Sequence, residues 1–372
     1  MGVMVMKLSK PMRGLLEKEW RHNRGYFLTT LLIIIYAPVI KTIFHLFRGG
    51  ASMEQWVQEL NFALTFGVGM ARPLVYSGLL QWIPALGALL LGIIILGEER
   101  KGGLNYLVST PVSRWQIILA KFFPGAGVVI LSMLVNGLFL VGFSLFQPVS
   151  YNNINVFSWC LLTGATCLCI FTVALLVSTF TSGVLATGVL CYFLNVLPGM
   201  VMAMIEHTGA RYFALAESVS IKLYKLGSYL TMSDYINHSE RHITSLKHDN
   251  NWITSCVSST CGLGPNYLLD SCILLAGVLL FLTLAIIIFQ RSSLQTGGTI
   301  FATGSARKTA LAVVVVIISF WLAFPRTETL LKFVLYFSLL TGIIYTGCHY
   351  LYRLLCYGWQ LPGMKKKAGS GF

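Results

Sequence analysis

Eight long apolar segments separated by shorter polar ones constrain the fold of this 372-residue chain more than any other feature. An α-helix rises 1.5 Å per residue, so about 20 apolar residues cross the roughly 30 Å hydrocarbon core of a bilayer. The segments are residues 26–47, 79–97, 122–146, 156–180, 184–205, 267–289, 309–324 and 330–350. Because their apolar residues are continuous and not alternating, they predict helices and not the strands of a barrel. We therefore predict an all-α polytopic integral membrane protein with about eight transmembrane helices.

Composition and charge agree with this class and give an orientation. Hydrophobic residues make up 56% of the chain and charged residues only 11%, which is too few to cover a soluble globule. With the N-terminus inside, cytoplasmic segments hold 17 of the 27 Lys and Arg residues but 4 of the 13 acids, as the positive-inside rule requires. We predict cytoplasmic termini, and we attribute the net charge of +14 to topology and contact with membrane lipids, not to nucleic acid.

Residues 7–24 have the pattern of an amphipathic helix, with apolar residues at helical spacing and basic residues between them. We predict that residues 1–25 form a cytoplasmic helix that lies on the inner face of the membrane. The residues that define it are Leu8, Met12, Leu16, Trp20 and Arg21. The alternative is a basic leader that only sets the topology.

A charged insert, residues 98–121, separates the second and third apolar segments. Leu104 and Leu107 have helical spacing, and Thr110 followed by Pro111 has the composition of an N-cap and first turn for the next helix. We predict a short, apolar-faced helix that a groove in a partner protein could grip. The alternative is an ordinary basic loop, and Lys121 at its end is expected to extend its ammonium group to the membrane interface.

The insert resembles the coupling loop of ABC-2 type transporter permeases, in which this loop docks on an ATPase subunit. The residues that carry the resemblance and the implied contact are Glu98, Glu99, Arg100, Gly103, Leu104, Leu107, Pro111 and Arg114. The resemblance implies a transmembrane core over 26–290, with a coupling loop at 98–121 and an extracellular loop at 206–265. Residues 291–350 would form an additional hairpin beyond the family's common six spans, and 351–372 a basic cytoplasmic tail.

Sequence motifs for nucleotide binding and for common hydrolases are absent. The chain has no Gly-Lys dipeptide and therefore no phosphate-binding loop, and it lacks the His-Glu-x-x-His and Gly-x-Ser-x-Gly motifs. We expect that the chain is not an enzyme and that it holds no cofactor or metal of its own. The resemblance implies that separate cytoplasmic ABC ATPase subunits bind ATP and Mg²⁺.

The function that the resemblance implies is that of a permease subunit in a bacterial plasma (inner) membrane. Such a subunit pairs with a second copy or a paralogous permease and exports an amphiphilic substrate, such as a peptide or a lipid-linked or drug-like molecule, by alternating access. The alternative is a sensor or scaffold of an ATPase complex that signals envelope or antibiotic stress without transport. An intramembrane enzyme would need a polar catalytic pair, and the sequence nominates none.

Two further patterns give structural expectations. The extracellular loop predicts a short amphipathic helix over 212–229 followed by an irregular stretch. Cys256 and Cys261 in that stretch could form a disulfide if the compartment is oxidising. Within the apolar segments, Gly87 with Gly92 and Gly125 with Gly127 are expected to allow close approach of neighbouring helices.

Overall fold

The computed structural model describes residues 10–66, 79–97, 113–147, 152–181, 184–232, 235, 243–249, 252–257, 267–291, 304–324, 327 and 329–357. The chain divides into two compact units, residues 1–303 and residues 304–372, which are described separately below. The protein is an all-α polytopic membrane protein with one small β-hairpin in the described residues.

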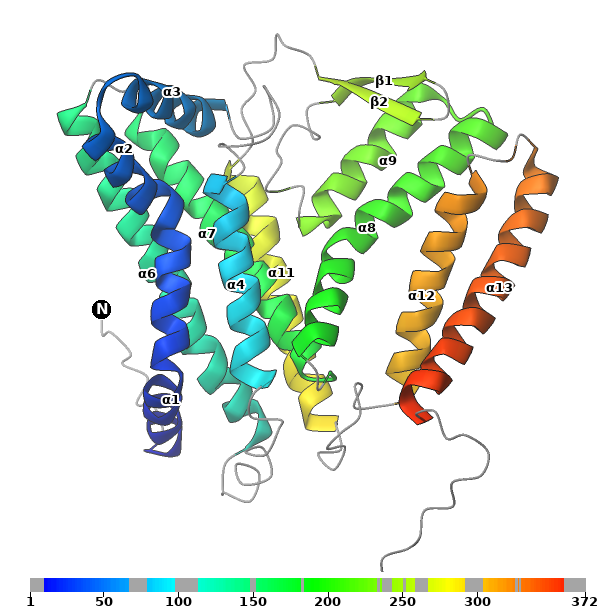
Figure 1. Ribbon diagram of the computed structural model, residues 1–372, viewed down its shortest axis with the longest axis horizontal. Helices are drawn as coiled ribbons and strands as arrows, with labels where there is room; N and C mark the ends of the chain where they lie inside the picture. The colour runs from blue at the N-terminus through cyan, green and yellow to red at the C-terminus, as the bar shows by residue number, and fades with distance from the viewer. Residues whose placement is uncertain are drawn as a thin grey trace, which may run out of the picture. The chain divides into compact units, whose positions relative to one another are not determined.

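The helices of the first unit are shown in Figure 1. They are α1 (Lys10–Ile35), the π-helical turn η1 (Tyr36–Lys41), α2 (Thr42–Arg48), α3 (Gly50–Phe66), α4 (Leu79–Gly97), α6 (Arg114–Phe146), α7 (Asn153–Ser178), α8 (Val184–Tyr212), α9 (Glu217–Leu230) and α11 (Tyr267–Arg291). The strands are β1 (Ile243–Asp249) and β2 (Trp252–Val257), and the second unit contains α12 (Gly304–Ala323) and α13 (Leu330–Tyr357).

Each of the eight predicted apolar segments is helical in the structure. Among the described residues, α6, α7, α8, α11 and α13 are each long and apolar enough to cross a membrane. Helices α1 and α2 are together long and apolar enough to cross a membrane, with a bend of 51° between them. The segments predicted at 79–97 and 309–324 contain the shorter apolar helices Trp82–Leu96 and Leu311–Ala323.

Helix α1 differs from the prediction that an interfacial helix ends near residue 25 and a separate span follows. It runs without a break from Lys10 to Ile35. The glycine at position 25 does not end it, because one glycine inside a helix costs only about 1 kcal/mol and the buried stripe continues from Met12 to Phe27 and Ile34. The bend lies instead at η1, where Pro38 has no backbone N–H to donate.

Helix α7 lies at the centre of the first unit, in contact with α3, α4, α6, α8 and α11. It is apolar on all sides, as expected for a helix surrounded by others, and 78% of its most apolar 18-residue stretch is buried. A Cβ at Gly92 of α4 would lie 2.7 Å from the carbonyl oxygen of Phe171, and a Cβ at Gly125 of α6 would collide with the Phe171 ring. The two glycines therefore allow α4 and α6 to approach α7, as predicted.

The other predicted glycine contacts have mixed outcomes. A Cβ at Gly87 would lie 2.9 Å from Cγ2 of Ile33, so this glycine allows α4 to approach α1. The prediction for Gly127 is wrong, because no atom lies within 4 Å of the Cβ position there. Gly127 lies two residues from Gly125, so it points away from α7.

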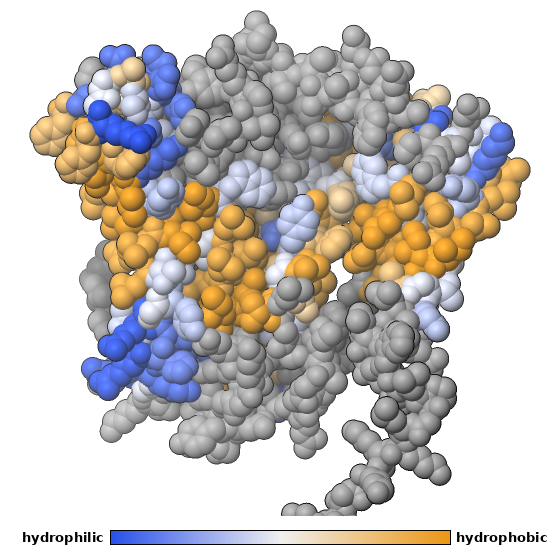
Figure 2. Space-filling view, viewed as in Figure 1, coloured by the Kyte–Doolittle hydropathy of each residue, from blue (hydrophilic) through white to orange (hydrophobic). Residues whose placement is uncertain are grey.

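Two ends of the first unit are named from here on. The basal end is where α4 ends, α6 begins and α11 ends, and the distal end is where α6 ends and α7 begins. At the distal end, α3 packs against α6 and α7 through a buried cluster that includes Trp56, Leu60, Leu140 and Trp159. Figure 2 shows apolar surface between the hydrophilic surfaces of α1 and α3, as a membrane environment requires.

The segment after α8 corrects one prediction and leaves another open. The predicted amphipathic helix is α9, which packs on α8. The stretch predicted to be irregular instead contains the antiparallel hairpin β1–β2, in which Leu246 is paired with Ser255. Cys256 lies in β2, but Cys261 lies outside the described residues, so the disulfide remains a prediction.

In the second unit, α12 and α13 pack against each other. Their contact is aromatic: the ring of Phe320 on α12 lies edge-on to Phe333 on α13 with centroids 5.6 Å apart, and Phe333 in turn stacks on Phe337. Such rings contribute specific geometry in addition to apolar burial.

Candidate functional site

The predicted coupling residues lie mostly outside the described residues. These are Glu98, Glu99, Arg100, Gly103, Leu104, Leu107 and Pro111. Arg114 and the points at which the segment 98–112 joins α4 and α6 are described. These two attachment points, the end of α4 and the start of α6, lie at the basal end.

Helix α6 begins with a well-defined cap directly after this segment. Ser113 is its N-cap residue, and the backbone N–H of Ser113 donates a hydrogen bond of 3.1 Å to Oε1 of Gln116. The prediction that Thr110 caps this helix is therefore wrong. Serine at the N-cap with glutamine three residues later is the pattern of a capping box, which fixes where a helix starts.

Arg114 joins the first turn of α6 to the last turn of α11. Its Nη1 atom donates hydrogen bonds to the carbonyl oxygens of Phe289, at 3.3 Å, and Gln290, at 2.9 Å. The last carbonyls of a helix lack partners within the helix and carry partial negative charge, so a guanidinium group is favourable there. The predicted role of Arg114 in contacting an ATPase is not tested by these contacts.

A buried ion pair connects α1, α4 and α6 at the same end. Nζ of Lys121 on α6 lies 3.2 and 3.1 Å from the two carboxylate oxygens of Glu19 on α1, and it donates a third hydrogen bond of 3.1 Å to the carbonyl oxygen of Ile95 on α4. The side chains are 0% and 2% exposed. Asn23 donates a hydrogen bond of 2.9 Å to Oε2 of Glu19 from the next turn of α1.

Sequence reasoning missed this pair and explained Lys121 as reaching the membrane interface, which the structure shows to be wrong. A signal was present in α1. Glu19 falls on the same helical stripe as Met12, Leu15, Asn23 and Phe27, all of which are buried. An acid on the apolar stripe of an amphipathic helix predicts a buried basic partner, because an unpaired buried charge is very unfavourable.

The ion pair is next to an apolar cluster to which five helices contribute. Its buried members are Met12 and Leu15 of α1, Leu96 of α4, Ile117, Ile118 and Ala120 of α6, Leu175 and Leu176 of α7, and Ala285 and Phe289 of α11. Polar and apolar contacts together therefore hold both ends of the segment 98–112 in one packed unit.

The residues predicted to define the interfacial helix do not share one environment. Met12 is buried in the basal cluster and Leu16 packs against it. Trp20 is 53% exposed and stacks on Phe27, and Arg21 forms an exposed ion pair of 2.7 Å with Glu17. Leu8 lies outside the described residues. The first turns of α1 therefore pack against the helix bundle on one side and expose Trp20 and Arg21 on another.

No group of three or more metal-binding side chains occurs in the described part of the chain. The basal end combines helix ends, a buried ion pair and an apolar cluster. These features define a multi-pass helical membrane protein in which one polar segment is anchored by several packed helices.

Comparison with known proteins gives the family. The model of the ABC-2 family transporter protein family matches residues 16–294, which is most of the chain, and the chain belongs to this family. The match ends before α12. The sequence is 28% identical over 125 residues to the probable ABC transporter permease YtrC of Bacillus subtilis strain 168, and 30% identical over 128 residues to the probable ABC transporter permease YtrD of the same strain.

Both alignments are partial. They cover 33% and 34% of this chain, and 35% and 37% of the two relatives. The aligned parts therefore span about a third of the length of the curated relatives.

Proposed function

We propose that this chain is the permease subunit of an ATP-driven ABC transporter and that ATP and Mg²⁺ bind to separate ATPase subunits. Membership of the ABC-2 family supports this role, and so does the similarity to two probable ABC transporter permeases. The absence of a phosphate-binding loop from the sequence agrees with an ATPase in another chain.

The observation that carries the proposal is the attachment of the segment 98–112 to a packed set of helices. An ATPase that grips Leu104 and Leu107 would pull directly on α4 and α6, the two helices to which the segment is joined. Lys121 would transmit the displacement to α1, because its ammonium group is hydrogen-bonded to Glu19 on α1 and to the carbonyl oxygen of Ile95 on α4. Arg114 would pass it to α11 through the carbonyls of the last turn.

The packing around α7 favours movement of these helices as a group. The backbones of α4 and α6 are close to α7 at Gly92 and Gly125, so neither can slide far without collision with Phe171 or Ala174. Packed interfaces move between discrete arrangements and do not deform continuously. Alternating access would then result from rotation of the group against a second permease copy or a paralogous permease, with the cargo at the interface between them.

We infer that the basal end faces the cytoplasm, because the positive-inside rule favours that side for the basic segments. The two relatives from Bacillus subtilis support a bacterial plasma membrane. Resemblance to the family supports export as the direction that we propose. An apolar path at the interface between two permeases would suit an amphiphilic cargo.

Flux in proteoliposomes tests the transport function. The permease would be reconstituted with the ATPase that co-purifies with it, and ATP-dependent movement of labelled amphiphilic peptides and lipid-linked precursors would be measured. We expect flux that stops when ATP is replaced by a non-hydrolysable analogue. Ligand-stimulated ATP hydrolysis without flux would instead support the sensor or scaffold and contradict the transporter.

A further inference from the structure

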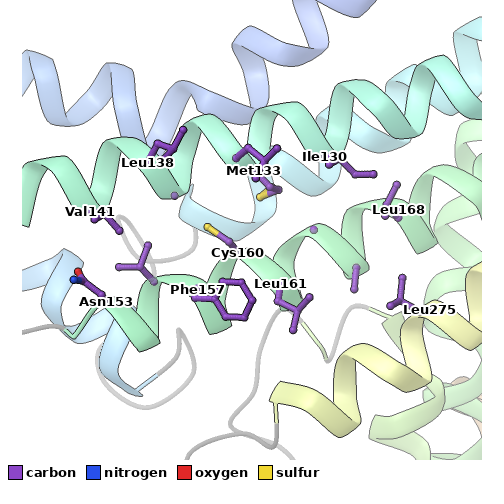
Figure 3. A pocket seen from close by; sticks show the side chains of 15 residues that line it. Ile130, Met133, Leu138, Val141, Asn153, Phe157, Cys160, Leu161, Leu168 and Leu275 are labelled. Carbon is purple, nitrogen blue, oxygen red and sulfur yellow. The ribbon is translucent and has the colours of Figure 1, made fainter. Parts of the chain in front are cut away.

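The outer surface of α6 and α7 has a groove that no part of the proposed coupling mechanism uses. It has a volume of about 380 Å³ and runs between the two helices, with Leu275 of α11 at the end near Leu168. Figure 3 shows Cys160 on α7 pointing into it toward α6. A volume of several hundred Å³ is sufficient for a small ligand or part of a larger one.

Two glycines form the groove where larger side chains would close it. A Cβ at Gly137 of α6 would lie 3.2 Å from Sγ of Cys160, and a Cβ at Gly164 of α7 would lie 3.3 Å from Cγ of Met133. The rims are large, exposed side chains, with Leu138 74% and Phe157 69% exposed. The hollow is therefore a feature of the packing between the helices and not a consequence of side-chain orientation alone.

The groove is apolar except at its distal end. There the side-chain oxygen of Asn153 lies 3.5 Å from Oγ of Ser144, and both are close to the ends of their helices. The remaining lining residues are apolar, glycine or cysteine. An occupant must therefore be a hydrocarbon along most of its length, with a polar group at one end.

The length of the groove matches one leaflet of a bilayer. The lining residues of α6 extend from Ile130 to Val141, which is about 16 Å at 1.5 Å per residue, and half of the hydrocarbon core is about 15 Å. About 380 Å³ spread over about 16 Å leaves a cross-section of about 24 Å². A partner's transmembrane helix, with a diameter of about 10 Å with its side chains, has a cross-section of about 80 Å². The dimensions therefore fit a single chain better than a helix.

We propose that this groove binds one acyl chain of a membrane lipid from the distal leaflet, with the lipid headgroup near Asn153. The bilayer supplies such chains at high concentration beside α6 and α7. The bound chain would fill the space between the glycines and restore contacts that an empty groove lacks. The inference requires only that the helices lie in a membrane, so it does not depend on ATP-driven transport.

The test uses the full chain in nanodiscs of phosphatidylcholine that contains a photoreactive diazirine in the middle of one acyl chain. Labelled peptides would be identified by mass spectrometry. We expect labelling of the segments around Leu138 and Phe157 to exceed by several-fold that at Leu279 and Leu280 of α11, which are comparably exposed but do not line the groove.

Variants that fill the groove provide the decisive comparison. Gly137→Leu fills it from α6 and Leu161→Trp fills it from α7, and each should reduce the labelling to the level at Leu279. Gly127→Leu is the matched control, because it adds the same side chain to α6 at a position with open space outside the groove. Its labelling should equal that of the unmodified chain.

Three results would overturn the proposal. Equal labelling in the groove and at Leu279 would show only ordinary lipid contact. Unchanged labelling in both filled variants would show that the label does not enter the groove. Labelling in the groove below that at Leu279 would show that protein, such as a second copy of the chain, covers it.

Discussion

The ammonium group of Lys121 on α6 lies 3.1 Å from Oε2 of Glu19 on α1, and neither side chain is accessible to solvent to any useful extent. The ammonium group also donates a hydrogen bond to the carbonyl oxygen of Ile95 on α4. Three helices thus meet at one charged group, at the end of the bundle where the segment 98–112 is attached.

Removal of one partner of this pair should strongly destabilise the protein. Lys121→Met leaves the Glu19 carboxylate buried without its cation, and the loss of one partner of a buried pair typically costs about 3–5 kcal/mol. The double variant Glu19→Gln with Lys121→Met should recover much of that loss, because it leaves no buried charge. Unfolding in detergent measures both values, and a double variant as unstable as the sum of the two single variants would contradict the pairing.

Arg114 should affect coupling more than stability. Arg114→Ala removes two hydrogen bonds to the last turn of α11 at a partly exposed position, and we expect a stability loss of about 1 kcal/mol. ATP consumption per molecule transported should rise if the link between α6 and α11 carries force. Arg21→Ala is the control, because it removes a basic side chain whose ion pair is exposed; equal coupling ratios for the two variants would argue against a role for Arg114.

An added methyl group should destabilise the protein at Gly92, which lies against α7, but not at Gly127, which faces open space. Gly92→Ala places a Cβ against the backbone oxygen of Phe171, which cannot move aside as a side chain could, so we expect a loss of about 1–3 kcal/mol. Gly127→Ala should be neutral or stabilising, because its Cβ meets open space and alanine favours helix. Thermal unfolding of the two variants gives the comparison, and equal effects would show that α4 and α7 are not in close contact.

Glu59 on α3 gives a pH-dependent prediction. Burial raises the pKa of this carboxyl group, and the opposing effect of Lys41 is smaller. A raised pKa in the folded state means that folding disfavours the ionised form of Glu59. The contribution of Glu59 to the free energy of unfolding is therefore greatest below the ordinary pKa of 4.5 and falls as pH rises through the pKa of the folded state. Glu59→Gln should therefore be more stable than the unmodified chain at neutral pH.

The pH profile of unfolding for Glu59→Gln distinguishes this cause from a change in packing. Its advantage should disappear in acid, where the glutamate is also neutral. Glu54→Gln is the control for the substitution itself, because Glu54 lies on the same helix but is exposed. An advantage for Glu59→Gln that is constant with pH would point to packing instead.

The helical, polytopic class and the positions of the apolar helices could be predicted from the sequence because each apolar segment is long enough to show its environment locally. The course of α1 could not be predicted in the same way. The boundary predicted at residue 25 is absent, because the packing of Phe27 and Ile34 in the bundle continues the helix to the bend at Pro38. Tertiary contacts decide such boundaries.

The candidate site shows the same division. Charge composition drew attention to the segment 98–112, but the pairing of Glu19 with Lys121 joins residues 102 positions apart in the chain. Only the acid on the apolar stripe of α1 hinted at it. The sequence does not distinguish Gly125 from Gly127, because both are glycines in the same apolar segment. Their environments differ in the structure, because only Gly125 of the two faces Phe171.

Co-purification of an ATPase tests whether the segment 98–112 binds an ATPase subunit. Leu104→Asp and Leu107→Asp would each be compared with Leu226→Asp, which changes an exposed leucine on α9, away from the basal end. We expect the permease to remain in the membrane in all three variants and the ATPase to be lost only from the first two. Retention of the ATPase by both variants in the segment would contradict this expectation.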